Sequence, residues 1–198
     1  MKVIGVLNNY ESKGNAELAF PNIFLLADSS LLKDGKPFFL PAFDAEFKMY
    51  ASLIVRVNRL GKNIAERFAH RYYDAVAIGL NVRAEDNLSQ QRERELPWSS
   101  SVAFDGSAIM GDFVDKEILD IEKLKFIISK NEKVIFEWDY TKLIKNIDTI
   151  ISEISARFTL KIGDYIYIGM PDEGFPIEIN DQILGSIDDK VLLKFKIK

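Results

Sequence analysis

The sequence predicts a mainly β protein with a few helices, built as one domain spanning residues 1–198. Short apolar and β-branched runs recur between turn residues, as is typical of strands. Helical spacing of apolar residues is confined to residues 64–73 and 140–157. No internal repeat and no linker rich in Pro, Gly or Ser divides the chain. The expected strands cover residues 2–7, 23–26, 37–41, 53–57, 76–82, 120–128, 133–139, 159–168 and 190–197.

In the N-terminal half, the run 53–57 passes into turn residues 58–63 and reads as a buried strand. Tyr50 and Ser52 open this strand, and residues two apart project from the same face. Asn63 can cap a helix over 64–73, which the strand 76–82 follows. The charged stretch 85–96 predicts a loop or a short exposed helix.

The C-terminal half predicts an amphipathic helix among strands. The apolar face of residues 140–157 consists of Leu143, Ile144, Ile147, Ile150, Ile151 and Ile154. Turn residues at 180–181 and Gly185 precede the last strand, 190–197.

Composition narrows the class of protein. Of 198 residues, 47% are hydrophobic and 28% are charged, so the chain can bury a core. A net charge of −4 argues against binding nucleic acid or an anionic membrane surface. The absence of cysteine excludes disulfides, thiolate metal sites and a cysteine nucleophile. Residues 1–10 read as a first strand, and no run approaches the ~20 apolar residues of a membrane helix, so we expect a cytoplasmic protein.

Spacing alone indicates no catalytic site. His70 has no serine or cysteine nucleophile motif nearby, and we expect a structural role for it. Asp44 and Glu46 form a D-x-E pair that would share one face of a strand. Glu85 with Asp86 and Asp172 with Glu173 are adjacent acidic pairs, and such pairs at turns are usually solvated.

Seven segments in order carry a resemblance to a known family. They are Pro21-Asn22-Ile23-Phe24-Leu25-Leu26 with Ser29-Ser30-Leu31-Leu32; Leu40-Pro41; Leu53-Ile54-Val55-Arg56-Val57 with Gly61-Lys62-Asn63-Ile64; Ile78-Gly79-Leu80-Asn81; Pro97-Trp98 with Phe104-Asp105; Thr159-Leu160 with Gly163-Asp164; and Gly169-Met170-Pro171. The chain resembles the fumarylacetoacetate hydrolase superfamily, which includes hydroxyhepta-dienedioate isomerases, acylpyruvate hydrolases and oxaloacetate decarboxylases.

The resemblance implies a β-roll of mixed sheets around a central pocket, in a homodimer. Residues 1–45 would form N-terminal strands and a lid region, and residues 46–198 the core of the roll. In active members, Mg²⁺ or Mn²⁺ is held by an E-x-E pair and an aspartate. The ion polarises an oxo acid and stabilises the enolate that forms.

Carried onto this chain, the resemblance places neutral residues at all three ligand positions. The glutamates fall on Tyr50 and Ser52, and the aspartate falls on Asn81. A phenol, an alcohol and an amide lack the negative charge that draws a hard divalent ion from water. We therefore expect no metal ligands, no cofactor and no catalytic residue in this chain.

Other positions implied by the resemblance also depart from the pattern. Two lysines fall on Leu26 and Val102, and two substrate-turn threonines fall on Ile168 and Met170. An Arg-Asp pair falls on Glu85-Asp86, and the lid segment 9–17 has no histidine. The expected vestigial pocket consists of Tyr50, Ser52, Asn81, Val102, Met170 and Leu26, a lining suited to a neutral or apolar group.

Three functions stay open from the sequence. The first is a family member that has lost metal binding and catalysis and acts as a binding or partner protein, for example beside an active paralogue. The alternative is an active hydrolase, isomerase or decarboxylase on an oxo acid, with its Mg²⁺ or Mn²⁺ absent or displaced onto Asp44 and Glu46. The third is an unrelated module that binds a small molecule.

Overall fold

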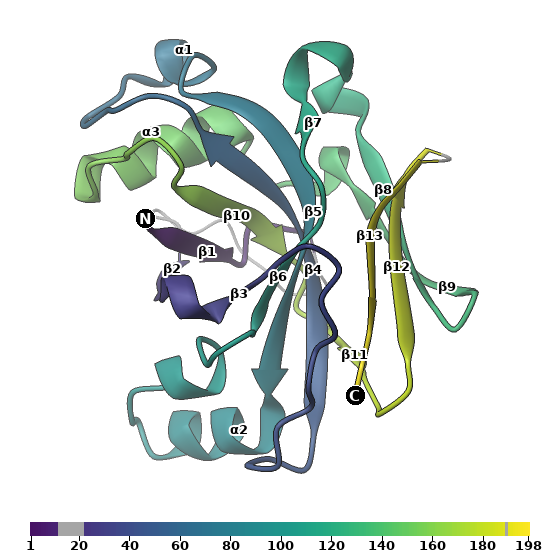
Figure 1. Ribbon diagram of the computed structural model, residues 1–198. Coiled ribbons are helices and arrows are strands. Elements are labelled where there is room, and N and C mark those ends of the chain that lie inside the picture. The colour runs from purple at the N-terminus through teal and green to yellow at the C-terminus, as the bar shows by residue number, and fades with distance from the viewer. Residues whose placement is uncertain (12–21, 189) are drawn as a thin grey trace.

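Two β-sheets make up most of the computed structural model, which describes residues 1–11, 22–188 and 190–198 (Figure 1). The large sheet has the strand order β2 (Asn22–Leu26), β1 (Val3–Leu7), β10 (Tyr165–Met170), β4 (Phe47–Val57), β5 (Tyr73–Ala84), β6 (Ala108–Met110) and β3 (Leu31–Leu32). To it are added β11 (Phe175–Pro176), paired with β4, and β7 (Val114–Asp115), paired with β5. The small sheet has the order β13 (Lys190–Lys196), β12 (Gln182–Ile187), β8 (Lys125–Lys130) and β9 (Lys133–Asp139).

The large sheet is mixed. Strand β1 runs parallel to β10, and β3 runs parallel to β6, whereas the remaining pairs are antiparallel. The sheet curls into a half-barrel, and the fold is mostly β with a few helices. This confirms the predicted fold class.

The helices lie at the ends of the large sheet: α1 (Glu66–Ala69) and α3 (Ile147–Arg157) lie near one end, and α2 (Glu85–Glu93) near the other (Figure 1). The Asn146 side chain caps α3 by accepting a hydrogen bond from the Thr149 amide at 2.8 Å, so the helix predicted over 140–157 begins at Ile147. Within α3 the isoleucines of the predicted apolar face are buried, whereas Leu143 and Ile144 precede the helix and are half-buried. Short 3₁₀ turns cover Asp28–Ser30, Ser99–Ser101, Lys116–Ile118, Ile121–Lys123 and Tyr140–Lys142. In the described part of the chain, no helix is long and apolar enough to cross a membrane.

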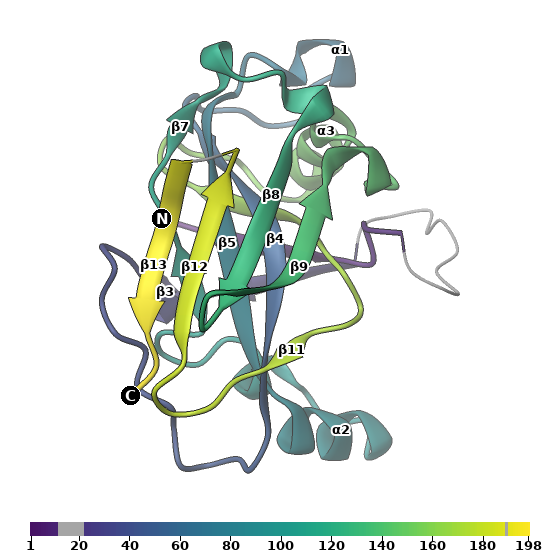
Figure 2. The ribbon, with the colours of Figure 1, turned by 90° about the vertical axis from the view of Figure 1, so that its right-hand side faces the viewer.

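Strands β4 and β5 are buried on both faces, and their side chains alternate between two cores. On one face, Leu53 and Ile78 belong to the main hydrophobic cluster, which the small sheet and α3 complete. Figure 2 shows the small sheet lying across β4 and β5. Gly185 of β12 permits this close packing, because a Cβ atom there would lie 3.2 Å from the Ile78 side chain.

The opposite face of β4 and β5 packs on a second hydrophobic cluster. Tyr50 and Ile54 belong to it, together with Leu7, Leu88 and Met170 from β1, α2 and β10. This face also carries the polar residues of the two strands, so the candidate site lies here and not between the sheets.

Several elements differ from the sequence prediction. Residues 37–41 form no strand, and only Phe38 makes an isolated bridge, with Ile197. The predicted strand 159–168 begins at Tyr165, because Asp164 closes a turn by accepting a hydrogen bond from the Lys161 amide. The helix at 64–73 is reduced to Glu66–Ala69, and 120–128 begins with a 3₁₀ turn before β8. Strand β12 was not predicted, since its glycine and serine break the apolar alternation.

Candidate functional site

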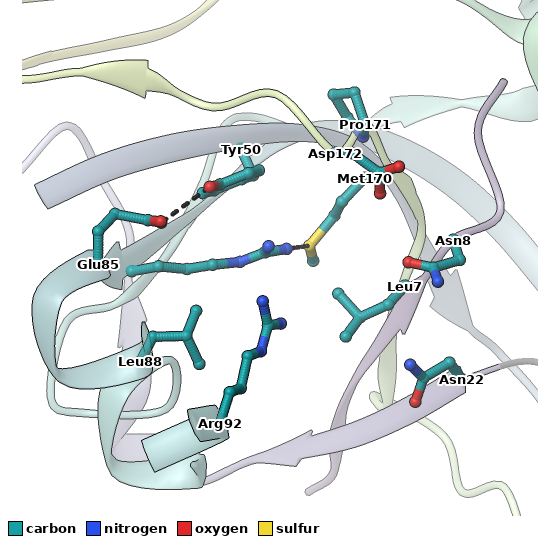
Figure 3. Close-up of a pocket in the computed structure, with 11 residues that line it drawn as sticks. Leu7, Asn8, Asn22, Tyr50, Glu85, Leu88, Arg92, Met170, Pro171 and Asp172 are labelled. Atoms are coloured by element: carbon teal, nitrogen blue, oxygen red, sulfur yellow. Dashed lines mark hydrogen bonds between the residues drawn. The ribbon is translucent and has the colours of Figure 1, made fainter. Parts of the chain in front are cut away.

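A cavity of about 460 Å³ opens where β4 and β5 meet the start of α2 (Figure 3). Two cationic and two acidic side chains line it: Arg83, Arg92, Glu85 and Asp172. The other lining residues are neutral: Leu7, Asn8, Asn22, Tyr50, Leu88, Met170 and Pro171. Its volume lies in the range of small-molecule sites, and its charged side chains suit a small polar ligand.

The register of β4 and β5 sets the geometry of this wall. Tyr50 lies directly opposite Asn81, so the two side chains share one face of the sheet. Arg83 lies two residues beyond Asn81 on β5 and projects from that same face. Ser52 lies opposite Gly79, one step further from the cavity.

Arg83 is the most strongly buried charged side chain of the cavity wall, with 7% of the residue exposed. Its Nε donates a hydrogen bond to Asn81 Oδ1 at 3.2 Å, and its Nη2 donates to Met170 Sδ at 3.3 Å. Its guanidinium carbon lies 3.6 Å from the centroid of the Tyr50 ring. Burial lowers the pKa of Arg83, but a guanidinium still carries its charge at neutral pH.

Tyr50 joins this cation to a carboxylate. Its hydroxyl donates a hydrogen bond to Glu85 Oε1 at 2.8 Å, and its ring faces Arg83. Burial is the main cause that raises the pKa of Tyr50; the nearby charge of Arg83 opposes it, while the bond to Glu85 adds to it. The phenol is therefore a neutral hydrogen-bond donor at neutral pH.

Asn81 is fully buried, and both of its amide atoms have partners. Its Nδ2 donates to the backbone oxygen of Val102 at 2.9 Å and to that of Ser107 at 3.3 Å. Its Oδ1 accepts from Arg83. Asn81 therefore ties β5 to the segment 102–107 and orients the guanidinium.

Ser52 is also fully buried and connects strands. Its hydroxyl donates to the Leu53 carbonyl at 3.1 Å and accepts from the Gly169 amide at 3.3 Å. The bond from Gly169 joins β10 to β4, and Ser52 does not line the cavity.

The six residues of the expected pocket separate into two groups. Tyr50 and Met170 line the cavity, whereas Ser52, Asn81, Val102 and Leu26 are buried outside its lining. Leu26 and Val102 pack in the same hydrophobic cluster as Tyr50 and Met170. The structure thus gathers the six residues in one region and exposes two of them to the cavity.

The residues present do not fit a divalent metal ion. The three positions that the resemblance gives to metal ligands carry neutral donors, and a guanidinium contacts two of them. Within residues 1–11, 22–188 and 190–198, no group of three His, Cys, Asp or Glu side chains could hold a metal. Hard divalent ions require several oxygen ligands, usually carboxylates. The absence of a cofactor requirement nevertheless stays a prediction.

The displaced pair Asp44 and Glu46 precedes β4 instead of sharing a face of it. Asp44 accepts hydrogen bonds from the amides of Glu46 and Asn87, at 2.9 and 2.8 Å, and Glu46 pairs with Lys48 at 2.9 Å. Neither acid lines the cavity.

The remaining sequence candidates lie elsewhere. His70 is exposed after α1, where its carbonyl accepts a hydrogen bond from Lys116, and it does not line the cavity. Of the lid segment 9–17, residues 12–17 lie outside the described residues. Asn9 is buried and bonds the backbone of Lys145 and Ile168.

Arg83 and Arg92 are the cationic lining residues that sequence reasoning missed, together with the neutral residues Leu7, Asn8, Asn22, Leu88 and Pro171. The signal for Arg83 was present, because this arginine is the one charged residue in the run 76–84 and lies two residues from Asn81. A charge in a buried strand requires partners, and its spacing places it on the face of Asn81. Arg92 lies in a charged helix whose sequence resembles a solvated surface.

Fold and sequence together define a member of an enzyme family. The chain belongs to the fumarylacetoacetate hydrolase family, since the family model described as "Fumarylacetoacetate (FAA) hydrolase C-terminal" matches residues 2–194. It is 31% identical over 182 residues to the mitochondrial oxaloacetate tautomerase FAHD1 of Mus musculus, covering 91% of this chain and 82% of that protein.

Solved structures share the fold. Fumarylpyruvate hydrolase from Pseudomonas aeruginosa, in complex with Mn²⁺ and pyruvate, superimposes with a TM-score of 0.90 at 21% identity and covers 100% of this chain and 89% of its own. The 5-carboxymethyl-2-hydroxymuconate delta-isomerase from Mycobacterium smegmatis has a TM-score of 0.86 at 25% identity, covering 99% and 78%. The relatives carry the names of enzymes, and nothing in these comparisons supports the expected loss of catalysis.

Proposed function

We propose that the chain binds a small oxo acid in the cavity and acts on it without a divalent ion, as an isomerase of the keto–enol type. The relatives named oxaloacetate tautomerase supply the substrate class. The observation that carries the proposal is the lining of one cavity by two guanidinium groups, Arg83 and Arg92. Guanidinium groups bind carboxylates through paired hydrogen bonds.

Keto–enol isomerisation requires little machinery. A carboxylate takes the proton from the carbon beside the carbonyl, the C–H electron pair forms the C=C bond, and the π pair of the carbonyl moves to its oxygen. The carboxylic acid so formed returns a proton to that oxygen, directly or through water, and the carboxylate is regenerated. Glu85 and Asp172 are the two carboxylates of the cavity lining that could accept this proton. The developing negative charge on oxygen is stabilised by a fixed cationic donor, which Arg83 supplies. Atoms and electrons balance without a further reactant.

A second candidate is a non-catalytic binding or partner protein, as the sequence first suggested. It is favoured by the neutral donors of Tyr50, Ser52 and Asn81, whose hydrogen bonds are all made within the protein. In this case an oxo acid or another small anion would bind without being converted. The protein would act through its ligand or through an active paralogue.

The experiment compares turnover and binding in a chelating buffer. Purified protein with EDTA is mixed with oxaloacetate, and the decay of the enol absorbance is followed against buffer alone; cleavage of an acylpyruvate is assayed in parallel. An isomerase accelerates the decay without metal. Glu85→Gln should lower kcat by ~100-fold if Glu85 is the base, and Arg92→Gln should raise KM by ~10-fold. Lys123→Gln, an exposed charge outside the cavity, is the matched control and should change neither.

The outcomes separate the candidates. Binding of oxaloacetate by calorimetry without turnover would favour the second candidate over the first. If the chain neither binds nor converts oxaloacetate, the proposal that this cavity receives an oxo acid is overturned. Turnover that appears only when Mn²⁺ is added would contradict its metal-free character.

A homodimer and a cytoplasmic location are proposed on the family resemblance and the composition alone. The relatives named FAHD1 are described as mitochondrial. Light scattering of the purified chain tests the dimer, and imaging of a tagged chain in its own cell tests the location.

A further inference from the structure

We infer that the guanidinium of Arg83 occupies the place that the family resemblance gives to the divalent ion, as a cation fixed to the chain. The inference deepens the proposed function, because it names the group that would meet the oxo acid. The exclusion of a metal ion by Arg83 can be tested without any oxo acid, so the inference and the proposed function can fail separately.

The contacts of Arg83 locate this cation. Its Nε reaches Asn81 Oδ1 at 3.2 Å, and its Cζ lies 3.6 Å from the Tyr50 ring centroid. Asn81 and Tyr50 stand at two of the three ligand positions. Its Nη2 reaches Met170, which stands at the position of a substrate-contacting threonine. The guanidinium therefore lies among the residues that the resemblance gathers around ion and substrate.

The chemistry of these partners suits a guanidinium better than a metal ion. An aromatic face attracts a planar, weakly hydrated cation, and an amide oxygen accepts its N–H. A thioether is a soft, weak acceptor that Mg²⁺ does not prefer. The two kinds of replacement belong together. The guanidinium of Arg83 takes the place of the metal ion, and neutral residues take the place of the carboxylates that would hold the ion.

A divalent ion would be repelled from this place. It would lie beside a permanent positive charge that is 7% exposed and held from three sides. Charges in such a weakly screened environment repel more strongly than in water. No carboxylate stands at the ligand positions to offset that repulsion.

The cation also has donors left for a ligand. A guanidinium has five N–H donors, and within the described residues Arg83 makes hydrogen bonds from Nε and Nη2 alone. Arg92 rises from α2 toward the same space and makes no ion pair with any described residue (Figure 3). A small carboxylate between the two arginines would meet positive charge on both sides.

The first experiment titrates Mn²⁺ into the full chain and follows free Mn²⁺ by electron paramagnetic resonance. The wild-type chain should leave the ion free. Tyr50→Glu with Asn81→Asp restores two opposed carboxylates, yet Arg83 should neutralise them and keep Mn²⁺ affinity low. Adding Arg83→Ser to this pair should strengthen Mn²⁺ binding by at least ~10-fold.

The matched control adds Arg92→Ser to the same pair in place of Arg83→Ser. It removes an equal charge from the cavity but leaves the central guanidinium in place, so Mn²⁺ affinity should stay low. Equal gains from both arginine substitutions would overturn the inference, because they would show a general charge effect. Tight Mn²⁺ binding to the wild-type chain, with loss of that binding in Asn81→Ala, would also overturn it.

A second measurement covers the case in which the carboxylate variants do not fold. Oxalate is titrated by calorimetry into the wild-type chain in EDTA, and then with Mn²⁺ in place of EDTA. Equal affinity in both buffers, reduced at least ~10-fold in Arg83→Met and less in Arg83→Lys, supports a fixed cation. Oxalate binding that requires Mn²⁺ overturns it. No binding in either buffer tells against the proposed function, and the wild-type Mn²⁺ titration then decides the inference.

Discussion

The guanidinium carbon of Arg83 lies 3.6 Å from the centroid of the Tyr50 ring. This stacking joins a buried charge on β5 to an aromatic face on β4, and it accounts for a tyrosine at position 50. A glutamate at position 50 would form an ion pair with the cation directly. Tyr50 instead contacts the cation through its ring face and donates a hydrogen bond from its hydroxyl to Glu85. In the cavity wall, Tyr50 therefore lies between Arg83 and Glu85 and contacts both.

Substitutions of Tyr50 separate these two contacts. Tyr50→Phe keeps the ring face and loses the bond to Glu85, which should cost about 1 kcal/mol of unfolding free energy. Tyr50→Leu also removes the ring from Arg83 and should cost roughly 3 kcal/mol. Urea unfolding measures both. Equal losses would show that the ring face contributes nothing to the buried cation.

Asn81 should matter more for stability than Ser52. Asn81→Ala leaves two backbone carbonyls and the Arg83 Nε without their partner, at a cost of roughly 3 kcal/mol. Ser52→Ala removes one hydroxyl with two hydrogen bonds, neither of them to a charged group, and should cost about 1 kcal/mol. Thermal unfolding with van't Hoff analysis gives the two values, and a reversed order would contradict the clamp described for Asn81.

Asp164 anchors the parallel pair β1 and β10. Fully buried, it accepts from the amides of Lys2 and Lys161, at 2.7 and 2.8 Å, and pairs with the Lys2 ammonium at 2.6 Å. Asp164→Asn should cost roughly 2 kcal/mol in urea unfolding. The control is Asp74→Asn, which breaks an ion pair with Arg56 that is 39% exposed on both sides and should cost under about 1 kcal/mol.

Asp139 gives the fold a pH dependence in acid. A hydrogen bond from Lys125 is the largest cause that lowers its pKa from 3.8 to about 2, and bonds from Thr141 add to it. Because the folded pKa lies below the unfolded one, this stabilisation is present above pH 3.8 and is lost as pH falls toward 2. Asp139→Asn should flatten the fall in stability within that window. An unchanged slope in urea unfolding between these pH values would contradict the assignment.

The central strands and the amphipathic helix could be predicted from the sequence because their apolar residues follow regular patterns. The apolar, β-branched runs at 53–57 and 76–82 identify β4 and β5, which are longer than predicted. The strand predicted at residues 37–41 was wrong, because Phe38 is buried by a neighbouring segment without joining a strand. Such burial depends on tertiary contacts that periodicity does not record.

For the site, the sequence predicted the face of β4 and β5 that lies at the cavity, but not the two arginines that give the cavity its positive charge. Position 50 was correctly placed on the face of Ser52, and the cross-strand partner of Tyr50 proved to be Asn81. The role of Arg83 depended on that pairing, since the register of two strands decides what lies beside a buried arginine. Arg92 reaches the cavity from α2, a long-range approach that a single sequence does not disclose.

The most direct measurement is an anomalous difference map from a crystal soaked with MnCl₂ and oxalate. No manganese peak is expected beside Tyr50 and Asn81, and oxalate should lie between the guanidinium groups of Arg83 and Arg92. A manganese peak coordinated by Asn81, with the Arg83 side chain displaced from the Tyr50 ring, would contradict this expectation.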